Sequence, residues 1–259
     1  MDSLRAIDED EIDAALAKRA GFTGVLFGAE LNLDAREFAG LAFENCRFEV
    51  PVVREADFSE CSFKDCTFAP ARFASCKFND ARMTNCVFFS AEEKNGCTFA
   101  FCEMRQVAFD KCNLSSSTFD RSDLYNVVAA DCSFRSCKFG KSTFQSALSR
   151  KVVLCAAKFE RCNLSFADMS ALNLKGCEFT ESKFSETLFF ETDLSEAVFT
   201  NAILDRAEFE RARLAKADLR GATISGLNLA TVADYAGMTI SASQQDAILS
   251  ELGIKVWPG

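Results

Sequence analysis

The sequence predicts an all-β solenoid, in which short strands wind repeatedly around one axis. Two observations predict it. A large apolar residue recurs at every fifth position over most of the chain, and a small residue lies two positions before it. A helix repeats at 3.6 residues and a strand at 2, so neither explains a period of five. Such fixed self-similarity marks a solenoid, in which each unit buries its apolar side against its neighbours.

The apolar beat, as we call this fifth residue, runs in two registers. The first spans Leu33 to Phe88 with 12 beats, and the second spans Phe99 to Leu229 with 27. Of these 39 positions, only Ala129 and Ser149 are not large and apolar, and 21 are phenylalanine. The small residue and the beat are expected to face inward, and the other three residues of each pentad to face water.

The irregularities indicate how many pentads close one coil. The weak beats Ala129 and Ser149 lie four pentads apart, and each follows an apolar residue, Val128 and Leu148, that a shared local shift would turn inward. The register slips by one residue between Phe88 and Phe99. Counted back from the second register, the slip begins at position 89, which lies two four-pentad steps before Ala129. We therefore expect four pentads per coil, about ten coils, and a single interruption that adds one net residue.

Thirteen cysteines raise the question of disulfides or metal. All but Cys155 occupy the small inward position, where cysteine alternates with alanine and serine, so we interpret them as free buried thiols. Zinc ligands need close pairs, usually with histidine, and the chain has no histidine and no such pair. Unpaired thiols in this number favour the reducing cytoplasm, and we predict no metal and no cofactor.

Both ends of a solenoid need caps, because each exposes an apolar cross-section and unpaired strand edges. Residues 7–20 read as a helix stopped by Gly21, and a second helix is expected from Ser241 or Ser243 through Leu252, stopped by Gly253. The predicted division is an N-terminal helical cap over 1–30, a β-helix over 31–231, and a C-terminal helix and tail over 232–259.

The pentad Ala217-Asp218-Leu219-Arg220-Gly221 resembles the signature of the pentapeptide-repeat family, and the resemblance covers roughly residues 31–231. It implies a right-handed quadrilateral β-helix, in agreement with four pentads per coil. The tail segment Gly226-Leu227-Asn228-Leu229, followed by the segment from Ser243 to Val256, is similar to the C-terminus of the quinolone-resistance members, the Qnr and MfpA types. Those proteins carry projecting loops, dimerise through this end and bind DNA gyrase as a mimic of DNA.

This resemblance suggests a partner such as DNA gyrase or topoisomerase IV, with carboxylates standing in for phosphates. Net charge is −9, the required sign, although the rod over 33–231 holds 28 acids and 25 bases. Four glutamates at a spacing of five are expected to circle one coil as a belt, and three more acids fall on the face of Glu191. The candidate partner-binding acids are Glu181, Glu186, Glu191, Glu196, Asp168, Glu208 and Glu210.

The tail suggests a homodimer. Its apolar residues gather beyond the last coil and would form the interface, or would instead fold back over the end of one chain. Outward phenylalanines, Phe101, Phe166 and Phe190, could form a contact patch or simply occupy tolerant corners. The candidate dimer residues are Ile248, Leu249, Leu252, Ile254, Val256 and Trp257.

Several classes of function are disfavoured. The chain lacks histidine, a Gly-rich phosphate loop and a Gly-x-Ser-x-Gly motif, so no catalytic residue is assigned and an enzyme is not expected. No basic stripe indicates direct nucleic-acid binding, no apolar run is long enough to indicate a membrane span, and no signal peptide is visible. Two readings stay open: a DNA mimic that binds a type II topoisomerase, and a scaffold rod for another protein.

Overall fold

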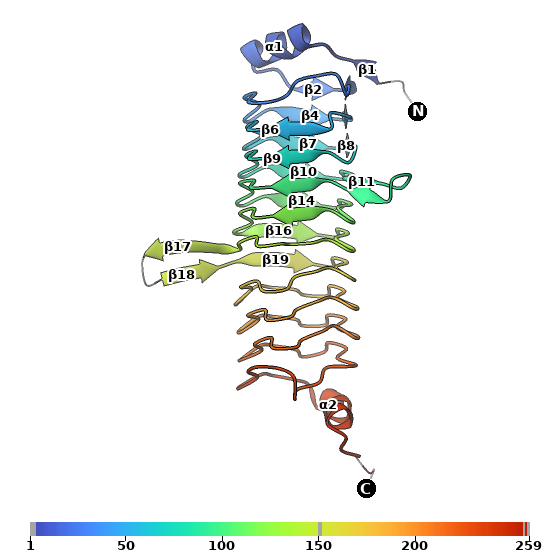
Figure 1. Ribbon diagram of the computed structural model, residues 1–259, viewed down its shortest axis with the longest axis vertical. Helices are drawn as coiled ribbons and strands as arrows, with labels where there is room; N and C mark the ends of the chain where they lie inside the picture. The colour runs from blue at the N-terminus through green and yellow to red at the C-terminus, as the bar shows by residue number, and fades with distance from the viewer. Residues whose placement is uncertain (1–3, 150–151, 256, 258–259) are drawn as a thin grey trace.

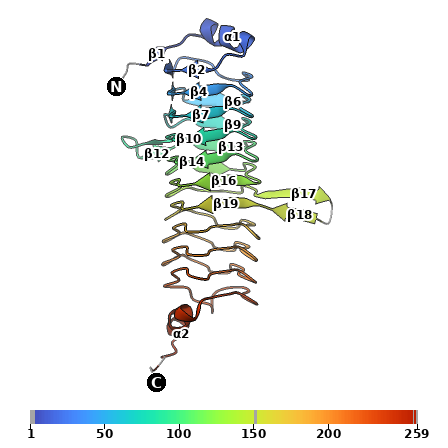
Figure 2. The ribbon, with the colours of Figure 1, turned by 180° about the vertical axis from the view of Figure 1, so that it is seen from behind.

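The chain forms a straight β-helical rod with a small helix at each end (Figures 1 and 2). The computed structural model describes residues 4–149, 152–255 and 257. Helix α1 (Glu9–Lys18) begins at Asp8, whose carboxylate accepts the N–H of Glu11 at 2.8 Å, and ends at Arg19 in the left-handed conformation. At the other end, the 3-10 turn η1 (Ala242–Gln244) leads into α2 (Gln245–Glu251).

Three parallel sheets run along the rod. The first contains β2 (Phe22–Thr23), β4 (Ala42–Glu44), β7 (Ser62–Lys64), β10 (Arg82–Thr84), β14 (Ala108–Asp110), β16 (Val127–Ala130) and β19 (Ala157–Glu160). The second contains β1 (Arg5–Ala6), β3 (Val25–Phe27), β5 (Arg47–Phe48) and β8 (Thr67–Phe68), and the third contains β6 (Val52–Arg54), β9 (Arg72–Ala74), β13 (Thr98–Ala100) and β15 (Thr118–Asp120). Isolated parallel bridges, such as Glu37 with Asp57, complete a fourth side.

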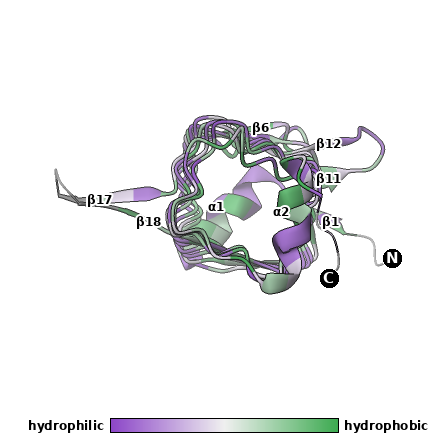
Figure 3. Cartoon of the chain, turned by 90° about the horizontal axis from the view of Figure 1, so that it is seen from below, coloured by the Kyte–Doolittle hydropathy of each residue, from purple (hydrophilic) through white to green (hydrophobic). Residues whose placement is uncertain are grey.

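The register of the ladder gives four pentads per coil. Phe43 pairs with Phe63, and Asn173 pairs with Asp193, so each partner lies four pentads further along the chain. Seen along the axis, the coils superpose into one ring (Figure 3). The ladder extends from Arg5, which pairs with Val25, to Thr239, which pairs with Asp218, and so reaches beyond 31–231 at both ends.

Phenylalanine rings fill the interior in columns. Because each coil repeats the one before, a ring lies directly over its equivalent in the next coil. One column stacks Phe27, Phe48, Phe68 and Phe88 with ring centroids 4.5 to 4.6 Å apart and planes within 5° of parallel. The spacing lies at the short end of the range for offset-stacked aromatic pairs. The core therefore runs the length of the rod as one continuous hydrophobic cluster.

The small inward position has a chemical preference. The thiol of Cys61 donates to the carbonyl of Phe38 at 3.0 Å, and the hydroxyl of Ser182 donates to the carbonyl of Phe159 at 3.0 Å. In both cases the acceptor is a beat residue of the preceding coil. A short side chain with one donor can add a hydrogen bond to this carbonyl, and cysteine, serine and threonine share that ability.

The chain turns each corner at the residue two positions after the beat. Most of these residues adopt left-handed backbone conformations although few are glycine, for example Glu181 with φ 56° and Ala171 with φ 57°, whereas Val50 and Pro70 do not. Such a conformation is normally costly for a residue with a Cβ. The corner N–H points along the rod instead of around the coil, and that of Glu181 donates to the carbonyl of Thr200 in the next coil at 3.0 Å.

Two antiparallel hairpins interrupt the coil, which corrects the expected single interruption of one net residue. The first joins β11 (Phe89–Ser90) to β12 (Asn95–Gly96), and the second joins β17 (Gln145–Ser149) to β18 (Val152–Cys155). Across the first, Met83 pairs with Phe109, where an uninterrupted coil would bring position 103. Across the second, Ala129 pairs with Phe159 in place of position 149. The insertions are thus six and ten residues long.

The expected shift at the weak beats is wrong for a related reason. Ala129 keeps the inward position and is fully buried, whereas Val128 is 41% exposed. Ser149 and Leu148 belong to β17 and have left the coil altogether. Ala129 and Ser149 are four pentads apart, which is the observed length of one coil. Only Ser149 marks a place where the chain leaves the coil.

Candidate partner-binding surface

The four glutamates of the belt occupy the four corners of one coil. Glu181, Glu186, Glu191 and Glu196 all have positive φ, between 56° and 61°, because each lies two positions after a beat. Their side chains point to solvent and are 41% to 48% exposed where they form ion pairs. The corners therefore present carboxylates around the rod rather than along it.

Three of these glutamates are paired with bases of neighbouring coils. Glu186 meets Arg206 at 2.7 Å and Glu191 meets Arg211 at 3.0 Å, each partner lying one coil further on at the same corner. Glu196 meets Lys175 of the preceding coil at 3.4 Å. Within the described residues, Glu181 forms no ion pair. Much of the belt's charge is neutralised in the unbound rod.

The remaining candidate acids lie on one side of the rod. Asp168 and Glu208 flank Leu188 in the same ladder of bridges, two coils apart, and Glu210 follows Glu208 toward the next corner. Asp168 accepts the N–H of Ser170 at 3.0 Å, so this carboxylate also holds its own turn. Glu208 and Glu210 are exposed. The ladder places these acids near Glu191 on a common face.

Opposite charges alternate along the axis at other places too. Lys64 reaches Glu44 at 2.6 Å and Arg54 reaches Asp34 at 3.1 Å, each across one coil. Pairs of this kind on an exposed surface contribute little stability, about 0–1 kcal/mol each. These pairs matter more for the pattern of surface charge, because they divide each face into short positive and negative segments.

The two hairpins are the largest projections from the rod, and they leave it on opposite sides (Figures 1 and 3). The longer hairpin, β17–β18, is held at its base by a contact of 3.4 Å from Arg105 Nη1 to Ser146 Oγ and by the N–H of Ala156, which donates to the Phe144 carbonyl at 3.1 Å. In the shorter hairpin, the N–H of Glu93 donates to Ser90 Oγ at 3.2 Å.

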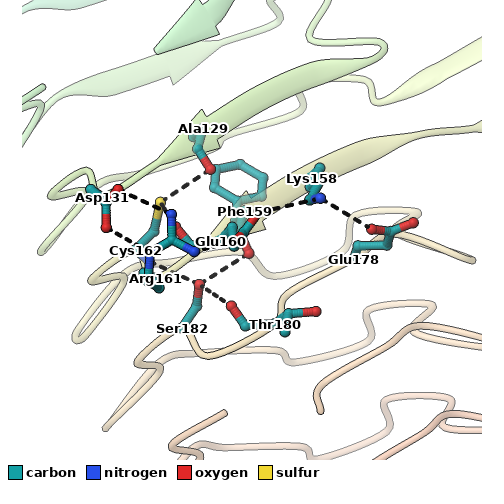
Figure 4. A network of polar contacts seen from close by, with 10 residues as sticks. All are labelled: Ala129, Asp131, Lys158, Phe159, Glu160, Arg161, Cys162, Glu178, Thr180 and Ser182. Atoms are coloured by element: carbon teal, nitrogen blue, oxygen red, sulfur yellow. Dashed lines mark hydrogen bonds and ion pairs between the residues drawn. The ribbon is translucent and has the colours of Figure 1, made fainter. Parts of the chain in front are cut away.

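A polar network connects the coils on either side of the β17–β18 insertion (Figure 4). Arg161 forms a bidentate pair with Asp131 of the preceding coil, with nitrogen–oxygen distances of 2.8 and 3.1 Å, and also contacts Glu160. The guanidinium lowers the pKa of Asp131 below its ordinary value, mainly through the hydrogen bonds. The network keeps neighbouring coils paired where the chain has detoured.

Three exposed phenylalanines carry an arginine on their faces. The Arg135 guanidinium lies 4.3 Å from the centroid of the Phe166 ring, and Arg121 and Arg211 lie 5.2 and 5.6 Å from Phe101 and Phe190. These are cation–π distances. The rings are 37% to 51% exposed, so the corners at Phe101 and Phe166 and the face position at Phe190 each offer a flat apolar surface beside a positive charge.

The C-terminal residues divide between cap and surface. Ile248 is buried against the last coil and Leu249 is half-buried. Leu252, Ile254 and Trp257 are 43%, 51% and 89% exposed, and Val256 lies outside the described residues. The buried amide of Gln244 closes the end of the rod by donating to the carbonyls of Leu219 and Ala222 at 2.8 and 2.7 Å.

The described part of the chain contains no helix of the length and apolarity that a membrane crossing requires. Over the same residues, no group of three or more histidine, cysteine, aspartate or glutamate side chains is arranged to hold a metal ion. The thirteen cysteines are free, and all except Cys155 are buried. The surface features that remain are corners, faces and hairpins.

Sequence reasoning found the acids and the outward phenylalanines but missed both hairpins. Two signals could have indicated them. Gly96 interrupts a polar segment at a position where a Cβ would come within 2.5 Å of the Ser115 carbonyl. At the second hairpin, Ser149 is a failed beat, and Leu154 keeps the phase of the beat but is 41% exposed.

Comparison with known proteins finds a family model that matches part of the chain and solved structures of similar fold. The model of pentapeptide repeats matches eight copies, over residues 54–89, 150–186 and 192–229. No curated protein matches the chain by sequence. The structure of full-length QnrB1, a plasmid-mediated fluoroquinolone resistance protein, is similar with a TM-score of 0.69 and 20% identity, over 91% of this chain and 99% of that one.

Two further solved structures are similar to a lower degree. A trypsin-treated point variant of QnrB1 has a TM-score of 0.60 and 22% identity, over 92% of this chain and 100% of that one. HetL, a pentapeptide-repeat protein of heterocyst differentiation regulation from the cyanobacterium Nostoc, has a TM-score of 0.42 and 14% identity over 90% and 94% of the two chains. The three matched segments carry pentapeptide repeats, and the fold of the chain is similar to that of full-length QnrB1.

Proposed function

We propose that this chain is a non-enzymatic rod that binds a type II topoisomerase, DNA gyrase, in place of DNA, and so modulates the enzyme or protects it from quinolone-type inhibitors. The observation that carries the proposal is the similarity to QnrB1, named for fluoroquinolone resistance, over almost the whole of both chains. A straight rod with two projecting hairpins is an architecture that suits such a mimic.

The charge of the rod fits this role in a limited way. A DNA duplex carries one phosphate charge per roughly 1.7 Å, whereas one corner of a β-helix offers one side chain per coil, about every 4.8 Å. The rod therefore matches the sign of DNA but not its charge density. Partner binding then requires the basic groups of the enzyme to compete with Arg206 and Arg211 for Glu186 and Glu191.

The test is the supercoiling of relaxed plasmid by purified gyrase, with and without a fluoroquinolone, as the protein is added. The proposal expects a change in supercoiling or restored supercoiling in the presence of drug. The matched variant replaces the four belt glutamates with glutamine, which removes charge but keeps shape, and it should act only at higher concentration. No effect of the wild-type protein at micromolar concentration contradicts the proposal.

A second function is favoured by one specific observation. The phenylalanine–arginine contacts at Phe101, Phe166 and Phe190 are apolar contact surfaces, which a partner with a phosphate-binding surface has no reason to use. In this reading the chain is a scaffold rod for a different protein. A pull-down with the wild-type rod, lost with Phe166→Ser and insensitive to salt, would favour it over the topoisomerase.

Dimerisation through the C-terminus is part of the proposal. The exposed Leu252, Ile254 and Trp257 lie beyond the last coil, where a second copy could cover them. Truncation near Tyr235 would remove Gln244 and open the end of the rod, so point substitution is the better test. Light scattering should give a dimer for the wild type and a monomer for Leu252→Asp combined with Trp257→Asp; equal masses contradict the interface.

We take the winding to be right-handed, with about ten coils, and the place of action to be the cytoplasm, where free thiols persist. A crystal structure tests the first two statements, and fractionation of the cells that produce the protein tests the third.

A further inference from the structure

Two thiols meet at the base of the long hairpin. Cys155 is the last residue of β18, and Cys177 fills the small inward position of the following coil. Their sulfur atoms are 3.6 Å apart. Cys155 is partly exposed, in contrast to the other twelve cysteines, which are buried. The pair therefore combines a reactive partner that solvent reaches with a second thiol in direct contact.

The local chemistry makes Cys155 the nucleophile of the pair. The hydrogen bond that Cys155 shares with Cys177 lowers the pKa of the Cys155 thiol, against burial and the nearby carboxylate of Asp193. The same hydrogen bond and burial raise the pKa of Cys177. The thiolate is the form of cysteine that reacts with oxidants, and reactive cysteines are partly exposed.

We propose that Cys155 and Cys177 form an intramolecular disulfide when the protein meets a hydroperoxide, and that this bond fastens the β17–β18 hairpin to the next coil. The Cys155 thiolate attacks one peroxide oxygen, the O–O bond breaks, and Cys155 becomes a sulfenic acid as hydroxide leaves. Cys177 then attacks that sulfur and expels water after losing its proton. In total, two thiols are oxidised and hydrogen peroxide is reduced to two water molecules.

The two sulfur atoms already lie close to bonding distance. A disulfide requires the sulfurs to approach to about 2.05 Å, a movement of about 1.5 Å that side-chain rotation can provide. In the reduced protein the Cys155 thiol donates to the carbonyl of Asn173 at 3.1 Å, which is a weak tether. The covalent bond would replace it. The inference does not depend on which protein the rod binds.

Peptide mapping tests the bond directly, because the sequence separates the relevant thiols. Trypsin releases Cys155 in residues 152–158, Cys177 in residues 176–183 and the nearby Cys162 in residues 162–175. The native full-length protein is treated with hydrogen peroxide, blocked with N-ethylmaleimide and digested without reductant. We expect a linked species of the first two peptides, two hydrogen atoms lighter than their sum, which disappears on reduction.

Matched variants test the assignment. Cys177→Ala introduces the residue found one coil below, Ala197, and Cys155→Ser is the second variant should the first fold poorly. Both should lose the linked species. In Cys177→Ala, peroxide should instead leave Cys155 as a sulfenic or sulfinic acid. Cys137→Ser serves as the control, because Cys137 is buried and donates to the Leu114 carbonyl at 3.0 Å.

Hydrogen exchange tests the effect on the hairpin. Amides of β17 and β18 should exchange more slowly in peroxide-treated wild type than in reduced wild type, with no such slowing in Cys155→Ser. Three results overturn the proposal: Cys155 ends as a sulfinic acid in wild type, the linked species contains Cys162 or joins two chains, or the 155–177 bond forms and hairpin exchange is unchanged.

Discussion

Arg206 lies one coil below Glu186 at the same corner of the rod, and its guanidinium nitrogen is 2.7 Å from the glutamate oxygen. Arg211 stands in the same relation to Glu191 at 3.0 Å. The four-pentad repeat creates both pairs, because it places equivalent corners in contact along the axis. The negative charge that this coil presents to a partner therefore depends on the basic residues of the next coil.

Removing those two arginines should expose the carboxylates. In Arg206→Gln combined with Arg211→Gln, we expect about threefold tighter binding to gyrase at low salt, because an exposed pair is worth at most about 1 kcal/mol. Titration of gyrase on a sensor surface measures the effect, which should shrink as salt is added. Arg220→Gln is the control, since Arg220 pairs with Asp218 away from the belt. Unchanged or weaker binding of the double variant at low salt contradicts this view of the belt.

The stacked phenyl rings should dominate stability. Phe119 lies between Phe99 and Phe139 with centroid distances of 5.2 and 5.0 Å and is almost fully buried. Phe119→Ala should lower the free energy of unfolding by about 3–5 kcal/mol, measured by urea denaturation. Phe190→Ala, on the surface where the residue is 37% exposed, should cost less than about 1 kcal/mol. Similar losses in both variants would mean that the ring columns do not carry the fold.

The apolar beat was sufficient to predict the solenoid, the inward phenylalanines and the buried thiols. These features depend on local alternation that every coil repeats, so a single pentad already contains the information. Cys61 and Ser182 illustrate it, since each occupies a small position whose acceptor is supplied by the coil before. The caps were also readable, because Asp8 and Gln244 act through contacts with nearby turns and the adjacent coil.

The phase of the beat could not reveal the length of the hairpins, for a definite reason. An insertion whose length is a multiple of five does not change the register of a five-residue repeat. The insertion of ten residues therefore leaves Phe144 and Phe159 in the same register. The insertion of six before Phe99 shows only as a slip of one. The ion pairs of the belt were missed because they depend on which corner residues stack, which requires the coil length and the rotamers together.

The left-handed corners predict a stabilising substitution. Ala171 has φ 57°, a conformation that disfavours a Cβ and that glycine adopts freely. Ala171→Gly should raise the free energy of unfolding by about 0.5–1 kcal/mol, and Ala171→Val should lower it. Ala167→Gly is the matched control, because Ala167 is buried in the small inward position and its loss should destabilise the rod. If both glycine variants changed the free energy of unfolding in the same direction, the left-handed conformation of Ala171 would not explain its effect.

The end of the rod should depend on one amide. Gln244 is buried and donates to the carbonyls of Leu219 and Ala222, close to the end of the ladder. Gln244→Ala leaves both acceptors without this donor and should cost about 2 kcal/mol of stability. Thermal unfolding of the variant beside Gln245→Ala, which changes an exposed neighbour, measures the difference. Equal melting temperatures would show that the amide does not close the rod.

The pair beside the long hairpin predicts an acid-dependent loss of stability. The pKa of Asp131 is lowered in the folded chain by its hydrogen bonds to Arg161 and lies at its ordinary value when the chain unfolds. A lowered folded pKa means that the ionised carboxylate stabilises the fold above the unfolded pKa, and that this contribution is lost as pH falls through the folded pKa. Asp131→Asn should therefore be less stable than wild type at neutral pH.

The two stability curves should then converge in acid, because protonated Asp131 is equivalent to asparagine in charge. Melting temperatures of both proteins, taken from neutral pH to below the ordinary range of carboxylates, measure the convergence. Added salt should narrow the neutral gap, since Asp131 and Arg161 are 39% and 44% exposed. A gap that stays constant down to the acid limit would mean that the substitution acts through packing, and the Asp131–Arg161 pair would then have no electrostatic part in holding the coils together across the insertion.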